Sequence, residues 1–244
     1  MLRFLTFVVI LVVVQSVKLP PNFRKCNRSQ PNLKQCVLEA AQHGVSQLTK
    51  PFPHLNIPSL APLLVPELNI IKDGQGKVAV NQYFTDCKFY GFNNIKFDQF
   101  EFDFDKKTLQ VKGVFPDITK SCHYKMDGKI LLLPVKGEGP STAVLKNVKT
   151  VCRLHYDEVK NNGKTYMKFT KSELDIEPDF VSFNFENLFN GDKALGDNVN
   201  KVLNENWRDV FHDVKDDHIQ VVNKILLSLM NNFFAKVSIE EAFD

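Results

Sequence analysis

The apolar positions of the chain follow first a helical, then an alternating, then again a helical period. Residues 33–48 carry apolar side chains every three to four positions, which predicts a helix that Ser29 caps and Pro51 ends. Over residues 77–189 the period falls to two, as in strands with one apolar face. Residues 192–234 return to the helical period without a proline. This order of elements predicts an α+β fold.

A proline-rich stretch separates the first helix from the strands. Five prolines lie within residues 51–66, a density that excludes a helix and a central strand. We expect an extended connection that packs on the domain, because its apolar side chains need burial. These side chains are Leu55, Ile57, Leu60, Leu63 and Leu64.

Local signals divide the alternating region into long strands. The phase of the alternation changes at residues 98–99, which predicts a β-bulge. We predict a turn at residues 136–140 (KGEGP) and a hairpin at residues 161–163 (NNG). Antiparallel strands of this kind leave one apolar face to cover, and the C-terminal helical segment is the candidate cover. As one unbroken helix this segment would be roughly 60 Å long, so we expect either a kink near residues 216–218 or an elongated molecule.

The first residues have the features of a secretory signal. Arg3 precedes an apolar stretch over residues 4–14, and small residues follow where a signal peptidase cleaves. The stretch is too short to span a membrane as a helix. We therefore expect a signal peptide at residues 1–16 and a single domain at residues 17–244 that is secreted, extracellular and not stably inserted in a membrane. Secretion also makes the sequon at Asn27 a candidate glycosylation site.

A secreted chain can form disulfides, and five cysteines are present. Cys26 and Cys36 are close in sequence and flank a proline-containing turn, so we expect a disulfide between them. Cys122 and Cys152 can also approach each other if the KGEGP turn joins their strands. Cys87 is then the odd thiol.

Charge and short motifs argue against several classes of function. The net charge is +3, from 31 Lys+Arg and 28 Asp+Glu, and basic residues are interspersed with acidic ones, so nucleic acid is not an expected partner. Residues 74–77 (GQGK) lack the helix that must follow a phosphate-binding loop. His212 and Asp216 have a chelating spacing, but a solvated helix explains them more simply. Four carboxylates fit the solvated face of a strand better than a glycosidase pair. They are Asp98, Glu101, Asp103 and Asp105.

Phenylalanine is the outlier in the composition, with 21 residues against five tyrosines and one tryptophan. A sheet and helices this rich in phenylalanine form either an ordinary filled core or the wall of an unfilled apolar channel. A channel binds a lipid-like molecule by burying apolar surface, at roughly 25 cal/mol per Å². No residue set supports catalysis, a metal or a cofactor, so we expect a protein that is not an enzyme.

Several stretches resemble the insect Takeout/juvenile-hormone-binding-protein family, over about residues 19–243. The Cys26 and Cys36 pair precedes the first helix as it does in the family, and the other matching stretches follow in the family's order. They are residues 57–63 (IPSLAPL), Tyr124 with residues 128–139 (GKILLLPVKGEG), residues 187–193 (NLFNGDK) and residues 203–207 (LNENW).

The resemblance implies a long C-terminal helix wrapped by a highly curved antiparallel sheet. The molecule is then elongated, with an internal apolar tunnel, and is related to the tubular lipid-binding superfamily. The implied function is a secreted carrier of a small hydrophobic ligand, such as juvenile hormone or a fatty-acid-like molecule, without catalysis. The three additional cysteines favour the broader Takeout-like group. Two other functions stay open: an extracellular interaction or modulator protein with a filled core, and a secreted hydrolase.

The apolar face of each predicted element supplies the expected tunnel wall. Tyr124 and Tyr156 carry the hydroxyls that a polar group of the ligand can meet. The wall comprises Tyr124, Met126, Ile130 and Leu132 from one strand, Cys152, Leu154 and Tyr156 from the returning strand, Val181, Phe183 and Phe185 from a later strand, and Leu203, Trp207 and Phe211 from the long helix.

Overall fold

The computed structural model describes residues 18–71, 77–131 and 133–244. Within these ranges, one large antiparallel sheet of seven strands combines with four α-helices. The helices are α1 (Leu33–Gln47), α2 (Lys193–Glu205), α3 (Trp207–Phe234) and α4 (Ile239–Phe243). The strands are β1 (Leu63–Ile70), β2 (Val78–Tyr90), β3 (Lys96–Asp103), β4 (Thr108–Ile130), β5 (Leu133–Asn161), β6 (Lys164–Glu177) and β7 (Phe180–Phe185).

The two longest strands, β4 and β5, form the spine of the sheet. They pair in one continuous register from Thr108 opposite His155 to Ile130 opposite Leu133. Each spine strand is long enough to pair with two further strands, one along each half. At one end the order is β2-β4-β5-β7, with β1 outside β2, and at the other end it is β3-β4-β5-β6. The expected curved antiparallel sheet is therefore confirmed.

The inner face of the spine changes phase near its middle. Leu109 and Val111 of β4 are buried at odd positions, whereas Ile118 and Tyr124 are buried at even positions. The change coincides with Asn147, which has a φ of 47° and stands on β5 between the paired positions that flank Pro116. Side chains alternate strictly along a regular strand, so such an irregularity is needed to move the apolar set from one phase to the other.

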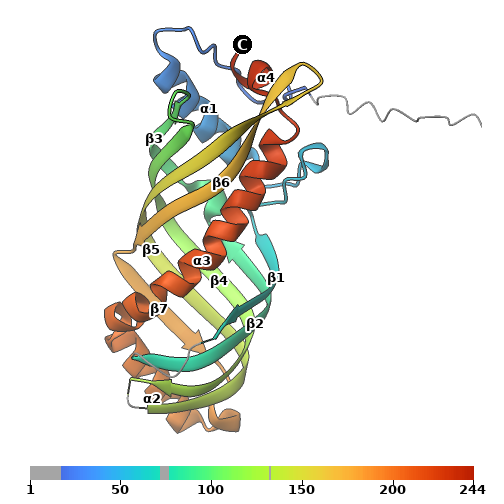
Figure 1. Cartoon of the computed structure of the whole chain (residues 1–244). Coiled ribbons are helices and arrows are strands. Elements are labelled where there is room, and N and C mark those ends of the chain that lie inside the picture. Colours follow the sequence, from blue (N-terminus) through green and yellow to red (C-terminus); the bar gives the residue numbers. More distant parts are fainter. Residues whose placement is uncertain (1–17, 72–76, 132) are drawn as a thin grey trace, which may run out of the picture.

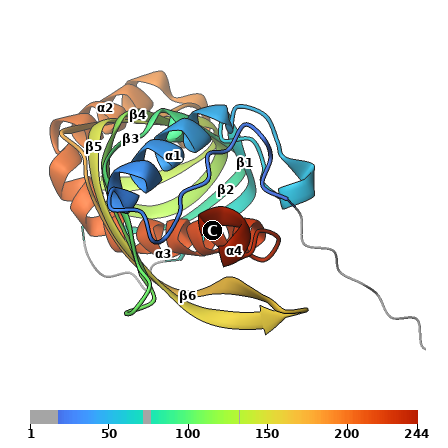
Figure 2. The same cartoon turned by 90° about the horizontal axis from the view of Figure 1, so that it is seen from above.

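Helix α3 runs along the sheet and lies across its open side. In Figure 1 the helix crosses the front of an elongated molecule, from α4 at one end to α2 at the other. Figure 2, which looks down on the end that carries α1 and α4, shows the sheet as an arc with α3 opposite its concave side. At 28 residues, α3 is about 42 Å long. The expected long C-terminal helix inside a curved sheet is confirmed.

Side-chain amides join the helices to the edges of the sheet. Each amide accepts a hydrogen bond from a backbone N–H and donates one to a backbone carbonyl, as a neighbouring strand would. Asn204 bonds both groups of Phe183 at 2.8 Å, and Asn200 bonds both groups of Phe185 at 2.9 Å. Three such joints belong to the C-terminal helices, because Asn231 of α3 bonds Phe169 of β6 at 2.8 and 2.9 Å.

The same device joins α1 to the sheet. Gln42 donates to the carbonyl of Ile95 and accepts from the N–H of Phe97, both at 2.9 Å. The curved sheet and α3 together form a tube (Figure 2).

Helix α3 has a second tie to the sheet besides the Asn231 joint with β6. The carboxylate of Asp213 in α3 accepts hydrogen bonds from the backbone N–H groups of Lys77 and Val78, at 3.1 and 2.8 Å. Helix α3 is thus bonded both to β6 and to the start of β2.

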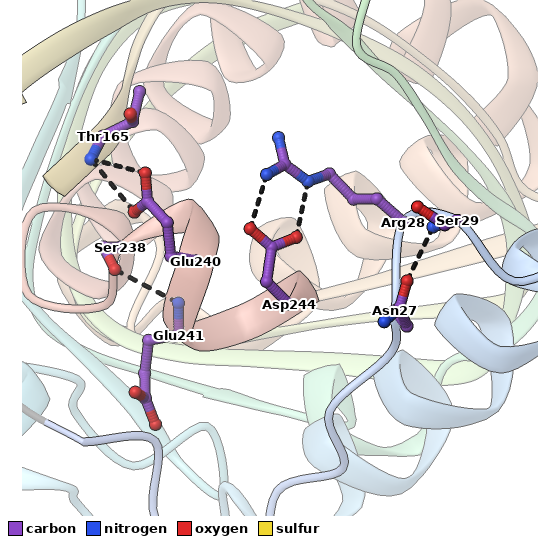
Figure 3. Close-up of polar contacts among 8 residues, drawn as sticks. All are labelled: Asn27, Arg28, Ser29, Thr165, Ser238, Glu240, Glu241 and Asp244. Carbon is purple, nitrogen blue, oxygen red and sulfur yellow. Dashed lines mark hydrogen bonds and ion pairs between the residues drawn. The ribbon is translucent and has the colours of Figure 1, made fainter.

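The segment before α1 and the C-terminal helix α4 meet at one end of the tube, where polar contacts hold them together (Figure 3). Arg28 donates two hydrogen bonds to Asp244, at 2.7 and 2.5 Å. Glu240 of α4 accepts from the N–H of Thr165 in the β5–β6 hairpin at 3.0 Å. The hydroxyl of Ser238, which is fully buried, accepts from the N–H of Glu241 and caps α4.

Several sequence predictions of local structure are confirmed. The register between β3 and β4 shifts between Phe97 and Gln99, where the bulge was expected. The NNG sequence forms the β5–β6 hairpin, with positive φ at Asn162 and Gly163. Strand β1 contains Pro66 and lies at the edge of the sheet, as proline requires.

Residues 136–140 do not form a turn but lie inside β5, so this prediction is wrong. Strand β4 instead ends at Ile130 and β5 begins at Leu133, and Leu131 between them has a positive φ. Gly137 and Gly139 do not serve a turn, but leave room for neighbouring parts of the chain to approach the β5 backbone closely. A Cβ at Gly137 would lie 2.7 Å from the hydroxyl of Tyr124, and one at Gly139 would lie 2.8 Å from the carbonyl oxygen of Glu186.

Two smaller predictions, for Ser29 and for Leu64, are also wrong. Of the two alternatives for the C-terminal helical segment, the elongated molecule is the one observed (Figure 1), and α3 has no break near residues 216–218. The segment breaks instead at Asn206, which has a φ of −111°. The Asn206 amide donates to the carbonyl of Val202 at 2.8 Å and so satisfies the end of α2. Ser29 does not cap α1, because Asn32 precedes that helix and the N–H of Ser29 bonds the Asn27 side chain. Leu64 is 63% exposed, because it points away from the core on β1.

Candidate ligand-binding interior

The inward side chains form two large apolar clusters, one at each end of the tube. The hairpin cluster lies where β4 turns into β5, and it includes Val80, Phe84, Tyr124, Met126, Val135, Leu203 and Val210. The terminus cluster lies at the end that carries α1 and α4, and it includes Cys26, Cys36, Leu109, Leu154, Phe169, Phe234 and Phe243. Side chains of α3 contribute to both clusters, so the helix is the element that links them.

The sequence-predicted wall residues are divided among these clusters and do not gather at one point. Tyr124, Met126, Ile130 and Leu203 are buried in the hairpin cluster, against which Phe183 and Phe185 are half-buried. Cys152, Leu154 and Tyr156 are buried in the terminus cluster. Val181, Trp207 and Phe211 form a smaller third cluster that also contacts Phe183. Leu132 lies outside the described residues.

The two tyrosines differ in the state of their hydroxyl groups. The Tyr124 hydroxyl donates a hydrogen bond of 2.6 Å to the carbonyl of Glu186, and its ring packs edge-on against Phe185. Burial raises the pKa of Tyr124 to about 12. The Tyr156 hydroxyl is buried and has no hydrogen-bond partner among the described residues. Burial also raises the pKa of Tyr156, so it stays a neutral donor that can serve a bound molecule.

The structure contains two disulfides. The expected bond between Cys26 and Cys36 is present, with the Cα atoms 5.9 Å apart. The second bond joins Cys87 of β2 to Cys122 of β4, beside the register irregularity between these strands. The predicted pairing of Cys122 with Cys152 is therefore wrong, and Cys152 is the free thiol.

This misassignment of the cysteines follows from the misplaced turn. Because β4 and β5 pair up to Ile130 and Leu133, Cys122 lies opposite Ser141 and Cys152 lies opposite Val111, far along the spine. The Cys152 thiol is 3.6 Å from the Ser172 hydroxyl, and burial raises its pKa. It is therefore held in the protonated, weakly reactive form.

Sequence reasoning missed a basic group on the inner face. Lys120 of β4 has the same phase as Ile118 and Cys122, which are buried. Its ammonium lies 3.3 Å from the centre of the Phe84 ring. Burial lowers the pKa of Lys120 to about 7. The strand phase was the signal that could have identified it, but lysine breaks the apolar pattern by which the face was recognised.

The groups considered for other chemistry are explained by exposure or by structural contacts. His212 and Asp216 are both exposed on α3, as expected for a solvated helix, and the nearby Asp213 bonds the start of β2. Glu101 and Asp103 form ion pairs with Lys34 and Lys106. Among the residues with described positions, no group of three or more His, Cys, Asp or Glu side chains is arranged to hold a metal. None of the described helices is long and apolar enough to cross a membrane.

The fold and the inward apolar faces define a class of α+β protein in which a curved antiparallel sheet wraps a long helix. The crystal structure of Takeout 1 from Epiphyas postvittana has this fold, with a TM-score of 0.80 and 26% sequence identity. The similarity covers 90% of this chain and 99% of that one.

The chain belongs to the haemolymph juvenile hormone binding protein family, whose model matches residues 4–244. This is a family of binding proteins for small hydrophobic ligands and not of enzymes. The circadian clock-controlled protein daywake of Drosophila melanogaster is 24% identical over 232 residues, covering 92% of this chain and 88% of that protein. Daywake of Drosophila yakuba is 23% identical over 231 residues, with the same shares.

Proposed function

We propose that the protein is a secreted carrier that holds a small hydrophobic ligand in an internal tunnel between the curved sheet and α3. The observation that carries the proposal is the pair of inward apolar clusters, the hairpin cluster and the terminus cluster, which α3 links along the length of the sheet. An apolar molecule placed along these clusters would gain roughly 25 cal/mol for each Å² of its surface removed from water.

Incomplete burial of inward aromatic side chains supports a ligand space. Phe89, Phe183 and Phe185 pack against the hairpin cluster, yet each keeps part of its surface accessible. On α3, Leu226 and Met230 do the same beside the terminus cluster. Side chains inside a filled core are close-packed and fully buried. Partial burial at inward positions is what the wall of a binding space requires.

The ligand class follows from the lining. Most of the groups that face inward are aliphatic or aromatic, so the ligand is lipophilic along most of its length. Tyr156 supplies a buried hydroxyl that is free to bond a polar atom of the ligand. Fatty-acid-like and juvenile-hormone-like molecules both belong to this class.

Substitution of Phe183 tests the tunnel against a filled core. In a displacement assay with Nile red, Phe183→Ala should shift the preference towards longer or bulkier fatty alcohols while the protein stays folded. Phe180→Ala is the matched control on the same strand, because Phe180 is 44% exposed. A filled core would respond instead with a cavity costing about 3–5 kcal/mol and no change in chain-length preference.

Secretion is part of the same proposal. Two disulfides fit an oxidising compartment, and Asn27 is exposed next to one of them. Expression in insect cells should yield a chain that begins near Val17 by N-terminal sequencing. Glycosidase treatment should reduce the mass of the wild type but not of Asn27→Gln. An unprocessed chain retained in the cells would contradict the proposal.

A further inference from the structure

One charged side chain lies on the inner face of the sheet, at Lys120. The neighbouring even-numbered residues of β4, among them Cys122 and Tyr124, are buried, whereas the odd-numbered His123 and Lys125 are exposed. Successive side chains of a strand point to opposite faces, so Lys120 points to the same side as Cys122 and Tyr124. Its position is therefore inside the tube.

The residues that lie beside Lys120 on the neighbouring strands are all apolar. The register places Phe89 of β2 on one side of Lys120 and Ala143 of β5 on the other, with Phe183 of β7 beyond Ala143. The Phe84 ring lies against the ammonium, at 3.3 Å from ring centre to Nζ. Phe89 and Phe183 are two of the half-buried side chains that support the ligand space.

Lys120 differs from Lys215, another partly buried lysine, in having no carboxylate partner among the described residues. The Lys215 side chain is 12% exposed and forms ion pairs with Asp175 and Glu177. For Lys120 no ion pair occurs with any described residue, and burial is the only influence that lowers its pKa. A buried charge is costly unless it is paired, and the contact with one aromatic ring compensates only in part.

Lys120 is nevertheless not sealed into the core. It lies deep in the molecule and still keeps part of its surface accessible, whereas Tyr124 and Met126 of the same strand are 1% and 2% exposed. Its accessible part lies beside Phe89 and Phe183, which are also partly accessible, so it would border the ligand space proposed above. A molecule in that space would reach the ammonium.

We propose that Lys120 is the anchor for the carboxylate of a long-chain fatty acid, whose acyl chain lies against the apolar lining. This inference rests on the proposed carrier function and names the ligand's head group. An incoming carboxylate supplies the missing ion-pair partner inside an apolar enclosure, where charge-assisted hydrogen bonds are strong. The tyrosine hydroxyls do not supply a positive charge, and Tyr124 already bonds Glu186, while Tyr156 offers only a neutral hydroxyl.

Paired ligands that differ only in the head group test the proposal. We would measure displacement of Nile red, a neutral apolar probe, by palmitic acid and by hexadecanol. Wild-type protein should prefer the acid by at least about tenfold, the value of one charge-assisted hydrogen bond. Lys120→Met should lose this preference while it keeps its affinity for Nile red and for the alcohol. Lys125→Met, on the exposed side of the same strand, should retain it.

A labelling experiment on the wild type gives an independent readout if Lys120→Met does not fold. An amine with a pKa near neutrality reacts with an acylating reagent at neutral pH faster than ordinary lysines. Palmitic acid should protect Lys120 from acylation, as measured by peptide mass mapping, and hexadecanol should protect it less. Equal protection by both lipids, or a retained acid preference in Lys120→Met, would overturn the anchor. If wild-type protein bound neither the probe nor either lipid, the carrier function itself would be wrong.

Discussion

At the residue scale, the most informative side chains are those that break the apolar pattern inside the tube. Lys120 lies against Phe84 without an ion-pair partner among the described residues, and Tyr156 has a hydroxyl without a hydrogen-bond partner. Groups of this kind lower the stability of the ligand-free protein. Both lie on inner faces, so a ligand that satisfies them recovers part of that loss on binding.

The Lys120 ammonium makes a pH-dependent contribution to stability. Its pKa falls from the ordinary value of about 10.4 to about 7 on folding, so between these pH values the unfolded chain binds the extra proton. The free energy of unfolding of the wild type should therefore rise with pH through this window, relative to Lys120→Met. The difference between the two proteins should change by about 1.4 kcal/mol per pH unit at most. Urea titrations across the window measure this change, and parallel pH profiles would contradict it.

The cysteine assignments give a second prediction at this scale. Peptide mapping without reduction should find Cys87 linked to Cys122 and Cys26 linked to Cys36. Iodoacetamide should modify Cys152 only after denaturation, because that thiol is buried and protonated. Reduction of the Cys87–Cys122 bond should lower stability by about 2–4 kcal/mol. A peptide containing Cys122 linked to Cys152 would contradict the assignment.

At the scale of elements, the sequence predicts the features that depend on local hydrophobic periodicity. It does not predict the features that depend on contacts between residues far apart in the sequence. The bulge near Gln99 and the Asn162–Gly163 hairpin follow from alternation and turn chemistry. Gly137 and Gly139 led to the prediction of a turn. They are glycines instead because Tyr124 and Glu186, from other parts of the chain, approach them closely. Wall residues could be assigned to inner faces by phase. Their division into separate clusters depends on the spine register, which the misplaced turn had shifted.

The amide joints between helices and strand edges are another feature that periodicity does not reveal. In the sequence, polar amide residues of a helix look like solvent-exposed positions. Three asparagines and one glutamine nevertheless bond backbone groups at the edges of the sheet. Asn204→Leu should lower the free energy of unfolding by about 1–3 kcal/mol, because the N–H and carbonyl of Phe183 lose their partners. Asn198→Leu, at an exposed position of the same helix, should change it by less than about 0.5 kcal/mol. Thermal or urea denaturation measures both, and equal effects would show that the joint contributes nothing.

At the scale of the whole molecule, the architecture solves the problem of a long sheet with one apolar face. The sheet curls, and α3 covers its open side with ties to β6 and β2. The two ends of the tube differ, because α2 lies at one end and α1 and α4 lie at the other (Figure 1). The ion pair between Arg28 and Asp244 holds that second end together. An apolar ligand is the occupant that such an enclosure suits.

Native mass spectrometry of the wild-type protein, after incubation with a homologous series of fatty acids and alcohols, tests the central claim most directly. We predict that each folded chain binds one lipid, that binding is saturable and has a chain-length optimum, and that the lipid is released when the protein unfolds. A protein that carries no lipid, or that carries several without an optimum of length, would contradict an enclosed binding space between the sheet and α3.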